Sequence, residues 1–318
     1  MEIFQRCRSS ISLVLLLVLT LSACAQHGGA GSRTQPRPRP SPSQTTSSGR
    51  SQATTSPGDT SPVPHVVVVV EENHSFDQII GSPSAPFLNQ LASESILLTA
   101  YHAVSHPSLP NYLAMISGDT HGITSDCTDC TVDGPSLAGQ LQDAGISWKA
   151  YMQGLPAPCS QVPRSSGYAK KHDPFMYFDH IRNSPQQCSR VVPFRELGAD
   201  LAAGRLPRLA FVVPDLDHDM HDGPISVADT WLRDLYGQLV ASPSWHHGSR
   251  LVVTFDEGTR GDNRVATVVA GPRLPPGDDG TTYSHYSLLR SIEARFRLPY
   301  LGHAADPSTA PIPALADR

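Results

Sequence analysis

Five consecutive valines, Val66 to Val70, constrain the fold more than any other stretch of this chain. A run that does not alternate apolar and polar residues is typical of a strand covered on both faces, as in the middle of a parallel sheet. Glu71, Glu72 and Asn73 follow the run directly, so polar groups stand at the carboxyl end of the predicted strand. Open α/β sheets bind ligands at this edge. We therefore expect a functional site there.

The same arrangement recurs further along the chain. The apolar run 209–213 leads into the acidic loop 214–222, and the apolar run 251–255 leads into Asp256 and Glu257. Parallel strands that end in acids bring those acids together at one edge of a sheet. The sequence thus predicts a carboxylate-rich site built from several strand ends.

Helical and strand patterns alternate over the rest of the chain without a second linker. Apolar spacing and cap residues predict helices over 136–144, 227–240 and 288–296. Further strands are predicted over 146–151 and 265–270. Such alternation indicates one α/β domain, residues 63–318, a three-layer sandwich in which helices flank a mostly parallel central sheet.

Residues 1–23 have the pattern of an export signal of the lipoprotein type. Two arginines precede the apolar run 11–21, which is short for a membrane span, and small residues then lead to Cys24. The pattern predicts a lipid on Cys24 that anchors the protein to a membrane outside the cytoplasm. An ordinary secretory signal cut near Ala23 or Ala25 is the alternative. Both predict export.

Residues 24–62 are rich in serine, threonine and proline and poor in large apolar residues, which predicts a disordered linker. Six of the 24 basic residues and two of the 29 acidic residues lie in the first 61 positions, so the remainder has nine more acidic than basic residues. That balance argues against nucleic-acid binding, which requires a basic face. It suits a site that gathers carboxylates around a cation.

Besides Cys24, four cysteines lie beyond the signal: Cys127, Cys130, Cys159 and Cys188. In an oxidising compartment they are expected to pair, although four cysteines allow three connectivities. We favour Cys127 with Cys130 and Cys159 with Cys188. A zinc or redox site at the first pair is the alternative, but its loop lacks a matching second pair.

Residues 154–197 contain repeated prolines and little periodicity. The pattern predicts a loop-like insert that covers the edge of the sheet and controls access of the substrate.

The strand ends offer oxygen ligands that suit a divalent cation rather than soft-metal thiolate chemistry. Glu72, Asn73, Asp256 and Glu257 form this set. Neither the identity of the metal nor the number of ions, one or two, follows from these residues.

The segment 105–112 precedes a predicted amphipathic turn, so Ser108 and Asn111 lie near the start of a helix. Helix N-termini attract anions. A cation beside Ser108 would make its hydroxyl a nucleophile, while Asn111 would hold phosphoryl oxygens. His221 or His285 would bind a second cation, hold the phosphate or protonate the leaving oxygen.

Several of these motifs resemble a known family. The stretch ENHSFD at 72–77, with HPSLPNY at 106–112, TFDEG at 254–258 and YSH at 283–285, is similar to the bacterial phosphoesterase family of acid phosphatases and phospholipases C. Members of that family share the alkaline-phosphatase-like fold. The resemblance extends over residues 65 to 300, with the motifs in the same order.

The resemblance implies an exported, metal-dependent phosphoric ester hydrolase with Ser108 as nucleophile. The metal positions that it implies are Glu72, Asn73, Ser108, Asp215, Asp219, Asp256 and Glu257. Asp219 stands where related enzymes place a histidine, which leaves the number of ions open. A phosphomonoesterase is favoured because the chain is short for the phospholipase members. A phospholipase C or phosphodiesterase, acting on a phospholipid head group or a diester, is the alternative.

Two functions of other classes compete with this interpretation. A non-catalytic binding lipoprotein on the same fold would explain the anchor but not the grouped serine, asparagine and acids. A metal-independent serine hydrolase would use the serine and histidines, yet no Gly-x-Ser-x-Gly motif surrounds Ser108.

Overall fold

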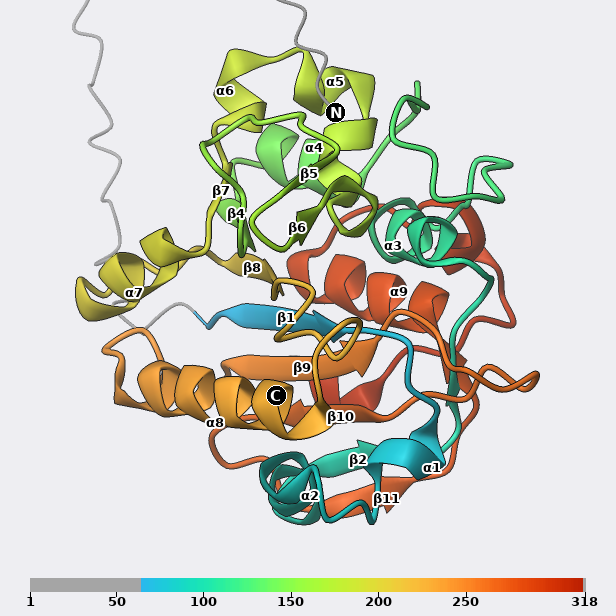
Figure 1. The fold of residues 1–318 in the computed structure, drawn as a ribbon, viewed down its shortest axis with the longest axis vertical. Helices are drawn as coiled ribbons and strands as arrows, with labels where there is room; N and C mark the ends of the chain where they lie inside the picture. The colour runs from blue at the N-terminus through green and yellow to red at the C-terminus, as the bar shows by residue number, and fades with distance from the viewer. Residues whose placement is uncertain (1–63, 317–318) are drawn as a thin grey trace, which may run out of the picture. The chain divides into compact units, whose positions relative to one another are not determined.

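A computed structural model describes residues 64–316 of the chain. An eight-stranded sheet forms its centre, with the strand order β11-β2-β10-β9-β1-β8-β4-β7 (Figure 1). Neighbouring strands are parallel, except that β10 is antiparallel to both β2 and β9. The strands of this sheet are β1 (Val66–Glu71), β2 (Ile96–Leu98), β4 (Trp148–Met152), β7 (Val191–Pro193), β8 (Leu209–Val213), β9 (Arg250–Phe255), β10 (Thr267–Ala270) and β11 (Gly277–Asp279).

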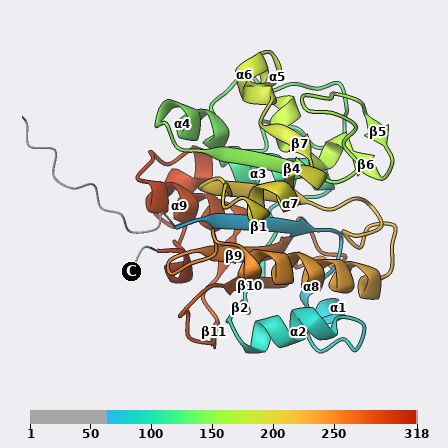
Figure 2. The same ribbon diagram turned by 90° about the vertical axis from the view of Figure 1, so that its left-hand side faces the viewer.

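Helices cover both faces of the sheet. Figures 1 and 2 show α8 and α9 on opposite faces, with α2 and α7 packed against α8 and with α3 packed against α9. The predicted three-layer, mostly parallel α/β architecture is therefore confirmed. The helices are α1 (Phe76–Ile79), α2 (Pro86–Ser93), α3 (Ser108–Ser117), α4 (Leu137–Asp143), α5 (Asp179–Arg182), α6 (Pro185–Cys188), α7 (Arg195–Ala202), α8 (Ile225–Ala241) and α9 (His285–Phe296).

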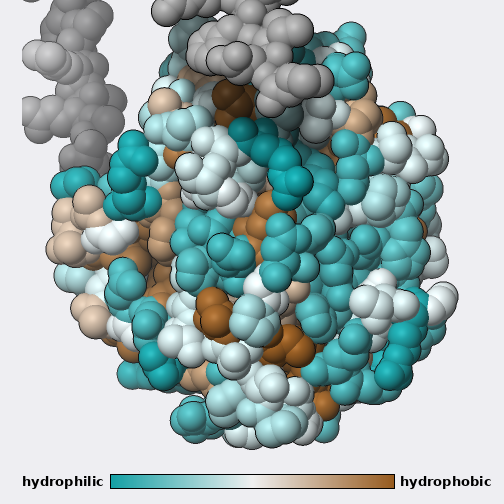
Figure 3. Space-filling view, viewed as in Figure 1, coloured by the Kyte–Doolittle hydropathy of each residue, from teal (hydrophilic) through white to brown (hydrophobic). Residues whose placement is uncertain are grey.

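The valine run forms the central strand, as its composition predicts. Every residue of β1 is buried, because the strand has β8 and β9 on its two sides and helices above and below. Its apolar side chains join one continuous core. On the surface, Figure 3 shows hydrophilic residues over much of one face of the molecule, with smaller apolar patches among them. Burial on this scale, about 25 cal/mol per Å² of apolar surface, is the main stabilising contribution to such a sheet.

The register of the sheet fixes the position of the polar residues. Glu71 is paired with Phe255, so Glu72 and Asp256 leave the sheet at the same level. The backbone N–H of Asp256 donates to the carbonyl of Glu71 (2.9 Å). The ends of β1 and β9 therefore deliver their acids to one point.

The predicted helices and strands outside this centre correspond to observed ones. The predicted helix 136–144 is α4, whose N-cap Ser136 accepts a hydrogen bond from the N–H of Gly139 (3.3 Å). The periodic segments 227–240 and 288–296 lie within α8 and α9, and the strands expected over 146–151 and 265–270 overlap β4 and β10.

Residues 154–197 are more structured than the loop-like insert that their prolines predict. They contain the hairpin of β5 (Arg164–Ser165) and β6 (Tyr168–Ala169), and the 3₁₀ helices η1 (Lys170–His172) and η2 (Pro174–Tyr177). Their β7 extends the main sheet as an edge strand. The elements are two to four residues long, so they show no periodicity that a sequence could reveal.

Some predictions lie outside the described residues. These are the signal peptide (1–23), the lipid on Cys24 and the linker (24–62). The predicted start of the domain, residue 63, also lies one position before the described residues. Within residues 64–316, none of the helices has the length and apolar character needed to cross a membrane.

Candidate active site

The site begins where β1 ends. Asn73 has a φ of 52°, a left-handed conformation that asparagine tolerates better than most residues, and it turns the chain sharply after the strand. Its backbone N–H donates to Oδ1 of Asp256 (3.1 Å). Glu72, just before the turn, is fully buried. The turn thus fixes Glu72 beside Asp256 at the sheet edge.

Ser108 is the first residue of α3, and its side chain meets Glu72. Its hydroxyl donates to Oε2 of Glu72 (3.3 Å), and both residues are buried. Tyr112, one helical turn further on, donates from its hydroxyl to Oε1 of the same carboxylate. Residues four apart share one helix face, so α3 directs a hydroxyl pair at Glu72.

Asp219 and His172 complete a compact cluster around Glu72. The carbonyl of Asp219 accepts the N–H of Glu72 (2.7 Å), and its Oδ1 accepts the N–H of His221 (2.8 Å). Nε2 of His172 lies 3.3 Å from Oε2 of Glu72, and its Nδ1 lies 3.4 Å from Oδ2 of Asp219. One ligand atom from each of Glu72, His172 and Asp219 lies within 4.8 Å of the others.

Several atoms in this cluster have no hydrogen-bond partner among the described residues. They are Nε2 of His172, Oδ2 of Asp219 and Oδ2 of Asp256, all buried. Buried polar atoms are normally paired, because desolvation without a partner costs about 1–3 kcal/mol. Two carboxylates, an imidazole and nearby Asp256 are a donor set that fits a divalent cation.

Burial shifts the pKa values in the cluster in opposite directions. Desolvation, with neighbouring Asp256 and Asp219, raises the pKa of Glu72 well above its ordinary value. Desolvation also raises the pKa of Asp219 and that of Asp256 to about 7. The same cause lowers the pKa of His172 well below its ordinary value. At neutral pH His172 is a neutral imidazole, the form that binds metals.

Asp256 and Glu257 have different surroundings, although they are adjacent. Oδ1 of Asp256 accepts the N–H of Glu257 (2.6 Å). The carboxylate of Glu257 is bonded to Nδ1 of His106, whose side chain is 53% exposed. Burial raises the pKa of Glu257 to about 7. This pair stands at the open side of the site, whereas Asp256 lies inside it.

The amide of Asn111 is fully engaged with the backbone before α3. Its Oδ1 accepts the N–H groups of Val104 (3.0 Å) and Ser105 (2.9 Å). Its Nδ2 donates to the carbonyls of Ser105 (2.9 Å) and Pro107 (3.1 Å). These bonds order the turn that presents Ser108. The role predicted from the sequence, contact with phosphoryl oxygens, stays a prediction.

His285 lies behind Asp256. It is fully buried, with Nε2 at 2.6 Å from the carbonyl of Asp256 and Nδ1 at 3.1 Å from the hydroxyl of Tyr101. Burial lowers its pKa to about 4, although the hydrogen bond to Asp256 opposes that shift. Both ring nitrogens therefore have protein partners, and the ring supports the end of β9.

The side chain of Asp215 is hydrogen-bonded to His218 and not to the cluster around Glu72. Its Oδ1 lies 2.6 Å from Nδ1 of His218 and accepts the backbone N–H of the same residue (3.1 Å). The ligand group of Glu72, His172 and Asp219 does not include it. Its predicted place as a metal ligand stays a prediction.

His221 is near the cluster and partly exposed. Its Nδ1 lies 2.7 Å from Oδ1 of Asp222, and its Nε2 lies 3.2 Å from Nζ of Lys171. Its ring lies 5.7 Å from that of His172, between centroids. The predicted catalytic histidine is thus brought to the site, together with a lysine that the sequence did not indicate.

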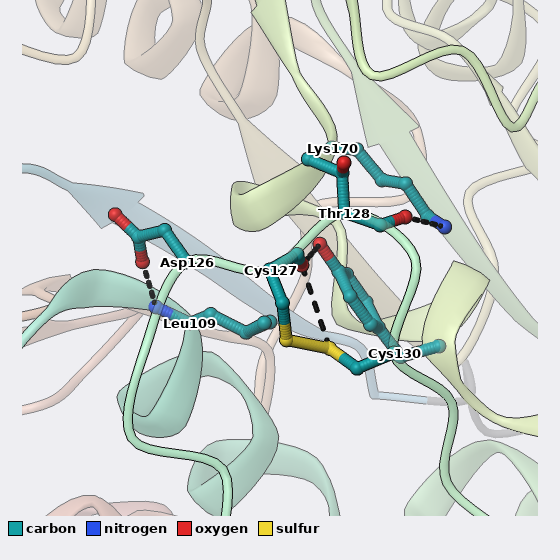
Figure 4. Close-up of a disulfide and its surroundings, with 7 residues drawn as sticks. Leu109, Asp126, Cys127, Thr128, Cys130 and Lys170 are labelled. Carbon is teal, nitrogen blue, oxygen red and sulfur yellow. Dashed lines mark hydrogen bonds between the residues drawn. A yellow bond between two sulfur atoms is a disulfide. The ribbon is translucent and has the colours of Figure 1, made fainter.

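Asp126, at the start of a disulfide loop, connects this lysine to helix α3. It accepts the N–H of Leu109 (3.0 Å) through Oδ1, the bond drawn in Figure 4. Nζ of Lys171 donates to its Oδ2 (3.0 Å). Cys127, the next residue, is joined to Cys130. Burial alone would lower the pKa of Lys171, but Glu72 and Asp126 outweigh it and raise that pKa.

Both predicted disulfides, Cys127–Cys130 and Cys159–Cys188, are confirmed. The zinc site considered for the first pair does not fit these bonded sulfurs, whereas a redox role of the pair stays a prediction.

The sequence reasoning missed four residues of the site for different reasons. Tyr112 stands four residues after Ser108, and helical spacing alone was a usable signal. Lys171 and His172 lie in a three-residue 3₁₀ helix inside the insert, and Asp126 lies in a polar loop. No periodicity or motif connects these three to the strand ends.

Comparisons with known proteins place the chain among phosphate-ester enzymes. The Phosphoesterase family profile matches residues 82–299. A phosphatidylinositol-3-phosphatase of Mycobacterium tuberculosis is 39% identical over 76% of this chain and 80% of its own length. An acid phosphatase of Aspergillus fumigatus is 32% identical over 67% of this chain, which spans 51% of that enzyme.

Solved structures agree in fold. An alkaline phosphatase superfamily protein from Vibrio parahaemolyticus superimposes with a TM-score of 0.53 and 14% identity, over 77% of this chain and 70% of the other.

Proposed function

Because the chain belongs to the Phosphoesterase family, we propose that it hydrolyses phosphoric ester bonds, as its relatives do. In this proposal it is an exported phosphomonoesterase. Ser108 is the nucleophile, and the surrounding acids hold a divalent cation. The observation that supports this most directly is the buried contact of the Ser108 hydroxyl with Glu72, inside a cluster whose facing atoms lack hydrogen-bond partners.

Glu72, His172 and Asp219 would hold the cation, with Asp256 beside them. Asn73 and Glu257 are further candidates on the same rim, as the sequence predicts. A bound divalent cation supplies Lewis-acid chemistry: it favours the deprotonated serine and neutralises phosphoryl oxygens. The oxygen-rich set with one imidazole is compatible with several metals, so the proposal concerns the site and not the element.

The protein's own residues then perform a two-step displacement. Oγ of Ser108 attacks phosphorus, which forms the Oγ–P bond and breaks the P–O bond to the leaving alcohol. In the first turn of α3 the N–H of Leu109 is bonded to Asp126 and Pro110 has none, so the N–H of Ser108 is the one that would face the phosphoryl group. His221, whose side chain is 25% exposed, donates a proton to the leaving oxygen. Water then cleaves the Oγ–P bond and releases phosphate.

The names of the relatives support a substrate class. The mycobacterial relative is named for a phosphate monoester on a lipid head group, and the fungal relative is named an acid phosphatase. We therefore propose a phosphate monoester, either a small molecule or a phosphorylated lipid head group. A phospholipase C or diesterase activity is the alternative that the experiment below must separate.

Two disulfides support export, because such bonds persist in oxidising compartments. The lipid on Cys24, with the membrane as a partner, remains part of the proposal and rests on residues 1–24 alone.

The test is turnover of p-nitrophenyl phosphate, bis-p-nitrophenyl phosphate and phosphatidylcholine by the purified protein, with and without chelator. We expect chelator-sensitive hydrolysis of the monoester that Ser108→Ala lowers at least ~10³-fold. Ser105→Ala is the matched control, since its hydroxyl donates only to the carbonyl of His106 (3.2 Å). That variant should stay within about threefold of wild type.

Other outcomes would overturn separate parts of the proposal. Chelator-resistant turnover would favour a metal-independent serine hydrolase. Full activity of Ser108→Ala would remove the nucleophile, and no turnover with any divalent metal would favour a binding lipoprotein.

A further inference from the structure

Lys171 brings a positive charge to a site otherwise lined by acids. Its Nζ lies 3.0 Å from Oδ2 of Asp126 and 3.2 Å from Nε2 of His221. Its side chain is 20% exposed and that of His221 is 25% exposed, so both remain accessible to a ligand. Nε2 of His221 accepts from the ammonium, so Lys171 supplies the anion-binding group of this pair, with a further N–H donor free to meet a ligand.

The position of Lys171 relative to Ser108 is fixed by Asp126. One carboxylate oxygen of Asp126 accepts the N–H of Leu109, the residue after Ser108, and the other accepts Lys171. Figure 4 shows the first of these bonds beside the Cys127–Cys130 disulfide. The lysine and the nucleophile therefore share one anchor.

The neighbouring Lys170 fixes the same segment from the other side. Its Nζ donates to the carbonyl of Thr128 (2.8 Å) and lies 4.7 Å from the ring centroid of Tyr177. Lys170 is buried, so its ammonium serves the packing of the disulfide loop. Lys171, by contrast, donates to Asp126 and lies beside His221. Although burial opposes the shift, the charges of Glu72 and Asp256 raise its pKa.

The charge of Lys171 would distinguish phosphate monoesters from diesters. A phosphate monoester has a doubly charged phosphoryl group at neutral pH, whereas a diester has one charge and an additional ester oxygen. The carboxylates around Glu72 would offset most of the charge of a bound divalent cation. The second negative oxygen of a monoester therefore requires another positive group. Lys171 is placed to provide it.

We propose that Lys171, held in place by Asp126 and His221, binds the non-bridging oxygen that a phosphate monoester has and a diester lacks, and so makes the enzyme prefer monoesters. The inference rests on the proposed function, since it assumes that Ser108 attacks a phosphoryl group in this site. It assigns a catalytic contact to a residue of the insert 154–197.

The experiment compares kcat/KM for p-nitrophenyl phosphate and bis-p-nitrophenyl phosphate in the full protein. Lys171→Met should lower the monoester value about 100-fold and the diester value no more than about threefold. It should raise the inhibition constant of inorganic phosphate at least tenfold. Lys171→Arg, which keeps the charge, should recover about tenfold or more of the lost monoester activity.

Lys149→Met is the matched control. Its Nζ pairs with Asp200 (2.6 Å) and Glu196 (3.7 Å) on α7, and none of these residues belongs to the site. We expect it to leave the ratio of the two kcat/KM values unchanged. Melting curves of all variants establish that they are folded.

Equal losses on both esters, without rescue by arginine, would show that Lys171 only positions the loop and would overturn the proposal. Unchanged monoester kinetics would overturn it as well. If the wild type hydrolyses neither ester, the proposed function fails. Calorimetric binding of inorganic phosphate then tests Lys171 independently: a tenfold weaker affinity in Lys171→Met supports the contact, and an unchanged affinity refutes it.

Discussion

The carboxyl ends of β1 and β9 and the insert 154–197 supply opposite kinds of side chain to one cluster. The strand ends provide carboxylates, Glu72 and Asp256, held by the register of the sheet. The insert provides nitrogen groups, His172 and Lys171, held by a 3₁₀ helix and by the disulfide loop. The rigid sheet thus fixes the negative charge of the cluster. On the proposed function, the insert would set the affinity for metal and phosphate without disturbing the core.

The largest test of this division removes the imidazole that we propose as the insert's ligand for the cation. His172→Ala should weaken binding of Mn²⁺ or Zn²⁺ by about 100-fold, because one of three clustered ligands is lost. His180→Ala is a matched control in the same insert, with its Nε2 3.0 Å from the hydroxyl of Ser136. Calorimetric titration measures both affinities. Equal affinities in the two variants would mean that the insert does not bind the cation.

The two disulfides allow a test of intermediate size. Cys127→Ser/Cys130→Ser should lower monoester kcat/KM about tenfold, because Asp126 anchors both Leu109 and Lys171. Cys159→Ser/Cys188→Ser should affect kcat/KM less than about threefold.

The free energy of unfolding should fall more in the Cys159→Ser/Cys188→Ser variant than in the Cys127→Ser/Cys130→Ser variant. Loop-closure entropy predicts a loss of about 2 kcal/mol for the short loop, whose cysteines are three positions apart, and about 3.5 kcal/mol for the longer one, with a separation of 29. Urea unfolding measures these losses. A larger activity loss in the second double variant would remove the special role of the first disulfide.

The pH dependence of the metal-free protein gives the smallest expected effect. Burial raises the pKa of Asp219 and that of Asp256 to about 7, above the unfolded value of about 4. Their contribution to stability is therefore full below about pH 4 and is lost as pH rises through 7. The lowered pKa of His172 acts oppositely, since its cost appears below about pH 6.5.

The melting temperature of the metal-free protein should thus fall by a few degrees, about 2–4 °C per kcal/mol, between pH 6.5 and 8. Saturating cation should remove this fall, because it neutralises the carboxylates. Asp256→Asn should reduce the slope in the metal-free protein. Scanning calorimetry across the range measures it, and a rise in melting temperature toward pH 8 would contradict the assigned direction.

The strand ends and the disulfides could be predicted because their signals are local. A five-valine run can only be a buried strand or helix segment, and the acids after it fix the edge that binds ligands. Ser108 was identified by its place at a helix start and by the resemblance. The three-residue spacing of Cys127 and Cys130 favours a local bond, and the structure contains it.

The insert could not be predicted, because tertiary contacts define its elements. His172 belongs to a helix of three residues, and it reaches Glu72 across 100 positions of sequence. The resemblance also offers Asp215 as a ligand; the structure pairs it with His218, and its place as a ligand stays a prediction. Motifs locate strand ends well, but they do not report which loop side chains turn toward them.

We propose that strand-end acids and His172 of the insert hold one cation beside Ser108. Anomalous diffraction from crystals grown with Mn²⁺ tests it directly. We predict a peak within about 2.0–2.6 Å of a carboxylate oxygen of Glu72, a carboxylate oxygen of Asp219 and a ring nitrogen of His172. Crystals of Glu72→Gln should lack the peak. A peak elsewhere, or none at saturating Mn²⁺, would contradict the claim.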